Sequence, residues 1–140
     1  MRKLFYLLPV ALLTLTFFSC RKDAPQPSIS IIGQWRFLNA VGGFTGKQVI
    51  SPRGNEIYTF KADSTFIRLR NDTVLRQGSF HILPVKSIFT GDMRSALLLN
   101  MAGYLDAASA QLITISKDTL VITDNHVEPY AYSFVRVYTK

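Results

Sequence analysis

Residues 31–38, with the sequence IIGQWRFL, open the folded part of the chain and hold its only tryptophan, Trp35. The residues before this stretch are typical of a targeting signal followed by a spacer. The residues after it form short runs of β-branched and aromatic side chains, separated by Gly, Pro, Asn and Asp. Such runs are typical of strands joined by turns. The sequence therefore predicts an N-terminal targeting signal and spacer followed by a single all-β domain.

The length and charge of the chain set limits on its class. Its 140 residues allow one domain, and about 110 to 120 of them, left after removal of a signal, suffice for one hydrophobic core. The formal charge is +7; without Arg2 and Lys3, 14 basic and 9 acidic residues give +5. The basic residues are scattered among apolar ones, whereas a nucleic-acid interface would cluster them. We therefore expect a mildly basic, solvated surface and no nucleic-acid partner.

The first twenty residues predict export and lipidation. Arg2 and Lys3 precede an uncharged apolar run, residues 4–18, which is shorter than the roughly 20 residues that a spanning helix needs. The only cysteine, Cys20, ends this region. Residues 17–20 (FFSC) resemble the lipobox of bacterial lipoproteins, which implies a signal peptide over residues 1–19 and a lipid on Cys20. An ordinary signal peptide cut near this point is the alternative.

The residues after the cysteine bear on location. No aspartate directly follows Cys20, which by the same resemblance implies lipid anchoring in the outer membrane, facing the periplasm or the cell surface. The Lys22-Asp23 pair resembles a surface-export signal of some Gram-negative bacteria. Two prolines between residues 24 and 28 favour an extended spacer. Residues 20–31 are therefore expected to be a lipidated cysteine and a flexible linker.

The remaining chain predicts eight strands in meander order. Residues 95–101 also fit a helical turn, because periodicity cannot assign so short a run. We expect residues 44–55 to form a long loop and Pro84 to end the fourth strand. Adjacent antiparallel strands favour an eight-stranded up-and-down barrel, with a β-sandwich as the alternative. The expected strands are residues 34–41, 56–61, 65–70, 73–82, 95–101, 111–116, 119–123 and 130–138.

A family resemblance supports the barrel. Gly33 and Trp35 form the Gly-x-Trp pattern of lipocalins, residues 58–66 look like the second and third strands of lipocalin-like domains, and residues 132–136 resemble their last strand. The resemblance implies a lipocalin-like β-barrel over residues 32–140.

The same resemblance implies structural roles for three residues. In lipocalins the tryptophan packs across the closed end of the barrel, and a basic residue of the last strand covers its ring. Carried over, Gly33, Trp35 and Arg136 would close one end of the barrel. A guanidinium over an indole face is a favourable contact.

The sequence offers no constellation for catalysis. His81 and His126 have no cysteine or second histidine at ligand spacing. The aspartates fall at expected turns, where they usually bind local backbone, and no serine lies in a nucleophile elbow. We therefore expect no catalytic residue, no metal, no cofactor and no enzyme activity. The turn aspartates are Asp63, Asp72, Asp118 and Asp124.

Two functions follow from this pattern. The first is a membrane-anchored lipocalin-like lipoprotein that binds a small apolar ligand in the cell envelope. The second is a structural or protein-interaction lipoprotein with a filled barrel, whose loops at residues 44–55 and 86–110 contact an envelope protein. A cavity of roughly 300 Å³ or more with an open mouth would favour the ligand.

Overall fold

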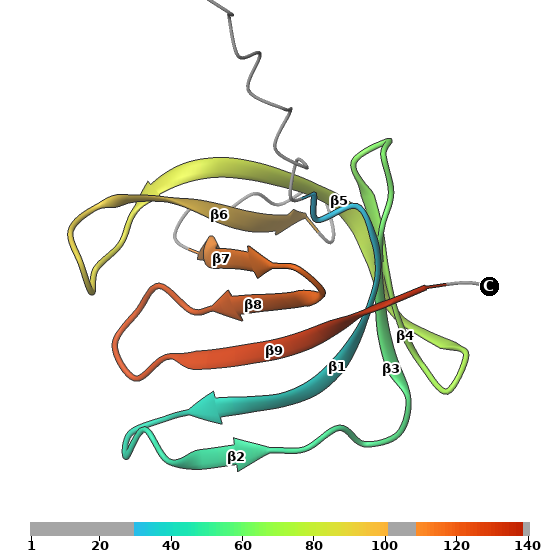
Figure 1. Cartoon of the computed structure of the whole chain (residues 1–140), viewed down its shortest axis with the longest axis horizontal. Coiled ribbons are helices and arrows are strands. Elements are labelled where there is room, and N and C mark those ends of the chain that lie inside the picture. Colours follow the sequence, from blue (N-terminus) through green and yellow to red (C-terminus); the bar gives the residue numbers. More distant parts are fainter. Residues whose placement is uncertain (1–29, 101–108, 139–140) are drawn as a thin grey trace, which may run out of the picture.

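The protein is described here by a computed structural model that covers residues 30–100 and 109–138. Nine antiparallel strands make up its regular structure (Figure 1). Within these residues no helix is long and apolar enough to cross a membrane. The strands are β1 (Gly33–Gly42), β2 (Gln48–Ile50), β3 (Glu56–Phe60), β4 (Thr65–Arg70), β5 (Thr73–Lys86), β6 (Met93–Asn100), β7 (Gln111–Ser116), β8 (Thr119–Thr123) and β9 (Tyr130–Val137).

The strands close into a barrel. Each of β3 to β9 pairs with its neighbour in sequence, and β1 pairs with both β3 and β9. Eight strands therefore form a closed antiparallel up-and-down barrel, as predicted, and the β-sandwich alternative is wrong. Closure gives each of these eight strands a pairing partner on both sides, which removes the two open edges of a flat sheet. The ninth strand, β2, is appended to the far half of β1, where residues 40–42 pair with residues 48–50.

Two local predictions are wrong. The expected loop at residues 44–55 contains β2, which forms because the second half of β1 extends past its pairing with β3. Pro84 does not end a strand, because β5 continues to Lys86 and Pro84 pairs with Ser95. Beyond Ser79, β5 pairs only with β6, so the missing N–H of Pro84 deprives no second neighbour of a hydrogen bond.

The open assignment at residues 95–101 is settled in favour of a strand, β6, which ends at Asn100. At the other end of the domain, Ile31 is buried in the core. Packing thus begins one residue inside the expected linker. The expected signal peptide, Cys20 and most of the linker lie outside the described residues.

One half of the barrel interior is filled by side chains. The largest completely buried side chains are aromatic or leucine, and rings from different strands meet edge to face, as Phe60 of β3 and Phe80 of β5 do with centroids 5.2 Å apart. This core accounts for the stability of the barrel, because its packing excludes water from large apolar surfaces. The large side chains that it buries completely are Trp35, Phe60, Phe66, Leu97 and Leu120.

Candidate functional site

The three residues assigned to barrel closure lie together. Trp35 and Arg136 are direct partners on β1 and β9, and the guanidinium of Arg136 lies 4.1 Å from the indole ring. Arg136 also donates hydrogen bonds to the carbonyls of Ser30 and Ile32, and the indole N–H donates to the Ile31 carbonyl at 2.6 Å. The entering chain is therefore tied to the first and last strands of the barrel.

Gly33 fits this arrangement for two reasons. Its φ of +131° is one that other residues rarely adopt. A Cβ at this position would also lie 2.9 Å from Nη1 of Arg136. The Gly-x-Trp pattern thus combines a backbone that needs glycine with a ring that the last strand covers. At this end of the barrel the Trp35 ring is completely buried, with Arg136 over its face.

The other half of the interior is polar. Along β3 and β4, the cross-strand pairs facing the interior change from Phe60–Phe66 through Tyr58–Arg68 to Glu56–Arg70. Alternate residues of a strand share a face. Because Phe66 is anchored in the core with 1% of its surface exposed, Arg68 and Arg70 must also point inward.

For Arg68 and Arg70, this placement corrects the expectation of a solvated basic surface. On β4 the apolar Ile67 and Leu69 lie on the outer side of the barrel, while the two arginines between and after them lie inside. Alternation alone predicts that the two pairs occupy opposite faces. It does not say which face is buried.

Glu56 joins the two arginines. Its carboxylate is 3% exposed and accepts hydrogen bonds from Nη2 of Arg68 at 2.7 Å and Nε of Arg70 at 3.0 Å. Nη2 of Arg70 lies 2.9 Å from the same carboxylate. Burial alone would raise the pKa of Glu56, but the hydrogen bonds and charges of the two arginines outweigh it and lower this pKa. Glu56 is therefore a charged anchor inside the barrel.

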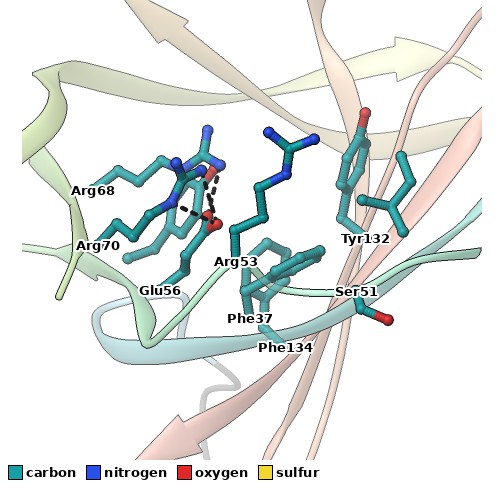
Figure 2. Close-up of a pocket in the computed structure, with 10 residues that line it drawn as sticks. Phe37, Ser51, Arg53, Glu56, Arg68, Arg70, Tyr132 and Phe134 are labelled. Carbon is teal, nitrogen blue, oxygen red and sulfur yellow. Dashed lines mark hydrogen bonds and ion pairs between the residues drawn. The ribbon is translucent and has the colours of Figure 1, made fainter.

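A cavity of about 210 Å³ opens beside this ion-pair cluster (Figure 2). Its walls combine aromatic rings with charged groups, including Arg53 from the segment between β2 and β3. Figure 2 shows the Arg53 side chain extending in the same direction as the hydroxyl of Tyr132, with no dashed contact. Three guanidinium groups face one carboxylate here, which leaves a formal charge of +2. The lining residues include Phe37, Arg53, Glu56, Tyr58, Arg68, Arg70, Tyr132 and Phe134.

A second cavity adjoins the first, and a third adjoins the second. The second, of about 270 Å³, shares the walls formed by Tyr58, Arg68, Tyr132 and Phe134 and reaches Arg76. The third, of about 320 Å³, shares Arg76 with it, together with Leu99 and Gln111. The polar half of the barrel is thus hollow, and the largest of these three cavities has the volume set above as favourable for a ligand.

One polar atom in this region has no partner. Nε of Arg68 is buried and forms no hydrogen bond with any of the described residues. The Arg68 guanidinium lies 5.2 Å from the Tyr58 ring centroid.

The two tyrosines that line this region are held neutral. Burial raises the pKa of Tyr58, so this phenol stays neutral well beyond neutral pH. Burial also raises the pKa of Tyr132, and the charge of Asp124 acts in the same direction.

Asp124 organises the rim beside the cavity of about 320 Å³. This buried carboxylate accepts hydrogen bonds from Nε2 of Gln111 at 2.6 Å and from the backbone N–H of Tyr130 at 3.1 Å. Next to it, Asn125 donates to the carbonyl of Lys86 and accepts from the N–H of Ile88, both at 3.0 Å. The β8–β9 loop is therefore pinned to the end of the β5–β6 hairpin.

The other residues considered from sequence are dispersed. Asp63 accepts hydrogen bonds from the backbone and side chain of Thr65, the turn role that was predicted. His81 is exposed on β5, and His126 is exposed in the β8–β9 loop with its Nε2 3.7 Å from Asp124. No group of three or more His, Cys, Asp or Glu in residues 30–100 and 109–138 is placed to hold a metal ion.

Comparison with protein-family models, curated proteins and solved structures finds no match to this chain. The cationic cavity was missed by sequence reasoning because its arginines come from separate segments. One signal was available: Phe60 and Phe66 flank a short turn, and if both face the core then Arg68 and Arg70 must share that face.

Proposed function

We propose that this chain is a lipid-anchored protein of the cell envelope whose barrel binds a small ligand in its open half. The supporting observation is the contrast between the two halves of the interior. Large side chains fill the half around Trp35, whereas adjoining cavities of up to about 320 Å³ occupy the half around Arg68. Ligand sites usually span about 300 to 1,000 Å³, so the ligand would be small.

The walls suit a partly apolar ligand. Phe37 and Phe134 line the first cavity, and Leu99 and Ile122 line the second. Such surfaces favour an apolar body, because its transfer from water is favourable by about 25 cal/mol per Å² buried. The proposed role is binding without chemical turnover. Recovery of the bound compound chemically unchanged after incubation with the protein would check this part of the proposal.

Native mass spectrometry of the protein purified from its own host tests the ligand. The wild type should carry an additional bound mass. Leu99 lines two of the cavities. Leu99→Trp would fill part of their volume, so this variant should lose the bound mass. Leu38→Trp is the matched control, because Leu38 is exposed and lines none of these cavities. A wild-type protein without any bound compound would contradict the proposal.

The proposed anchor is tested separately. We propose a lipid on Cys20, attachment to the outer membrane, and a spacer that holds the barrel away from the bilayer. Two or more acyl chains give stable attachment. Mass spectrometry of the mature N-terminal peptide should show a lipidated cysteine. Cys20→Ser should move the protein from the membrane fraction to the soluble fraction, and an unchanged distribution would contradict the anchor.

A protein-interaction role is the alternative, and exposed apolar side chains favour it. Phe44 is 82% exposed and Phe89 is 50% exposed, and both lie in the loops predicted as contact surfaces. Cross-linking in cells distinguishes the two functions. Loss of a cross-linked partner in Phe44→Ser or Phe89→Ser, with no mass bound to the purified barrel, would favour the alternative.

A further inference from the structure

The charges around the adjoining cavities do not balance. Four guanidinium groups line these cavities, those of Arg53, Arg68, Arg70 and Arg76, against the carboxylates of Glu56 and Asp124. Both carboxylates have partners already. Glu56 is held by two arginines, and Asp124 accepts hydrogen bonds from a glutamine side chain and a backbone N–H.

The cations, in contrast, have unused capacity. Arg53 and Arg76 form no ion pair within residues 30–100 and 109–138, and both are exposed at the rim, where a ligand can reach them. Arg68 is three-quarters buried, and its buried Nε lacks a partner among the same residues. A buried donor without an acceptor is unfavourable, and a guanidinium is well suited to bind the oxygens of an anion.

We propose that the ligand of this barrel is a small amphipathic organic anion. Its acidic group, a carboxylate or another oxyanion, would lie among Arg53, Arg68 and Arg76. Its apolar body would lie against the rings of Tyr58 and Phe134, which line two of the three cavities. This inference rests on the proposed binding function and adds the class of ligand to it.

Matched compounds test the charge requirement. The full-length protein is placed in phosphatidylcholine nanodiscs, and binding is measured by isothermal titration calorimetry against empty nanodiscs. The probes are 4-phenylbutyrate and its uncharged analogue 4-phenylbutanamide, which have similar shapes. We expect the acid to bind at least about tenfold more tightly, as charge-assisted hydrogen bonds are roughly twice as strong as neutral ones. Its affinity should fall as NaCl is added.

A second series of titrations distinguishes a free organic acid from a lipid headgroup as the source of the anion. Phosphatidylglycerol is added to the nanodiscs, which places an anionic lipid headgroup near the barrel. Displacement of 4-phenylbutyrate by this lipid would assign the same chemistry to a membrane headgroup. Unchanged binding of the acid would assign it to a free organic acid.

Variants locate the acidic group. Arg53→Gln removes an exposed cation without an ion pair, so it should weaken binding of the acid several-fold and leave thermal stability unchanged. Arg36→Gln is the matched control, because Arg36 is exposed on β1 and lines none of the three cavities. Glu56→Gln removes the competing carboxylate and should tighten binding of the acid, an increase that a purely structural role of the cluster would not produce.

The possible results separate this inference from the proposed function. Tighter binding of the acid, weakened by Arg53→Gln and strengthened by Glu56→Gln, supports the anion. Equal affinity for the acid and the amide overturns the inference that the ligand is an anion, but it agrees with the proposed function of a barrel that binds a small ligand. Failure of both probes to bind overturns the inference and counts against the proposed function as well.

Discussion

The Arg136 guanidinium lies 4.1 Å from the Trp35 ring and joins the last strand of the barrel to the first. The indole is completely buried beneath it. We expect Trp35→Ala to lower the free energy of unfolding by about 3 to 5 kcal/mol, because it leaves a cavity that the packed end cannot refill. Urea unfolding followed by circular dichroism measures this loss. Near-wild-type stability would mean that Trp35 does not hold this end together.

The contact between these residues can be measured apart from their burial. Arg136→Gln removes the cation over the ring, and we expect a loss of about 1 to 2 kcal/mol from that contact and the hydrogen bonds to the entering chain. A double-mutant cycle with Trp35→Phe should give a coupling energy of about 0.5 to 1 kcal/mol. Additive losses would show that the two side chains stabilise the barrel independently.

Glu56 should make stability depend on acid pH. Its pKa is lowered from an ordinary value of 4.5, so the folded state binds this proton less readily than the unfolded state. The stabilisation is therefore complete above about pH 5 and is lost as the pH falls through the lowered pKa. At pH 7 we expect Glu56→Gln to cost about 1 to 3 kcal/mol.

Chemical denaturation of both proteins from pH 7 to pH 3 measures this effect. The difference in unfolding free energy between the wild type and Glu56→Gln should shrink in acid. A constant difference would mean that the Glu56 carboxylate contributes nothing through its charge.

Tyr58 should have the opposite pH dependence. Burial raises its pKa above the ordinary value of 10.0, the charge of Arg68 opposes this shift, and the charge of Glu56 adds to it. A raised pKa favours the neutral phenol in the folded state, so its contribution is complete below pH 10 and is lost as the pH rises through the raised value. Tyr58→Phe should therefore lose less stability than the wild type above pH 10.

Thermal unfolding between pH 8 and pH 11 checks this prediction. Thr59→Val, at the next position on β3, carries no titratable group and should follow the wild type. Equal alkaline losses in Tyr58→Phe and the wild type would contradict a role for the buried phenol.

Gly78 marks a close approach of two strands. A Cβ at this position would lie 2.0 Å from the carbonyl oxygen of Asn100, and a backbone atom cannot move aside as a side-chain end can. We expect Gly78→Ala to cost at least 1 to 3 kcal/mol by overpacking. Gln77→Ala, at an exposed position of the same strand, is the control and should change stability by about 0.5 kcal/mol or less.

The strand pattern was predictable because it is local. The Lys117-Asp118 turn and the alternation of residues 65–70 each indicate a strand boundary or a strand face within a few residues, and β4, β7 and β8 were placed accordingly. The short strand β2 and the continuation of β5 through Pro84 were not predictable in this way. Both depend on which neighbour a strand has, and distant segments decide that.

The cavity was beyond local patterns for a similar reason. Its walls include Phe37 near the start of the domain and Phe134 near its end. Its volume is the space that side chains from several strands leave unfilled, so it depends on the packing of the whole barrel. Alternation along β4 divided its residues into two faces. Only the burial of Phe66 determined that the arginines point inward.

Closure of the barrel also has a consequence for how the chain folds. The β1–β9 pairing joins Gln34 to Val137, residues about 100 positions apart, and such non-local pairing raises the contact order and slows folding. Until β9 is in place, β1 and β8 each present an unpaired edge. Only the pairing of β9 with β1 and β8 covers these edges and protects the chain from edge-to-edge aggregation. A version truncated before residue 130 should therefore aggregate, even if its earlier hairpins form.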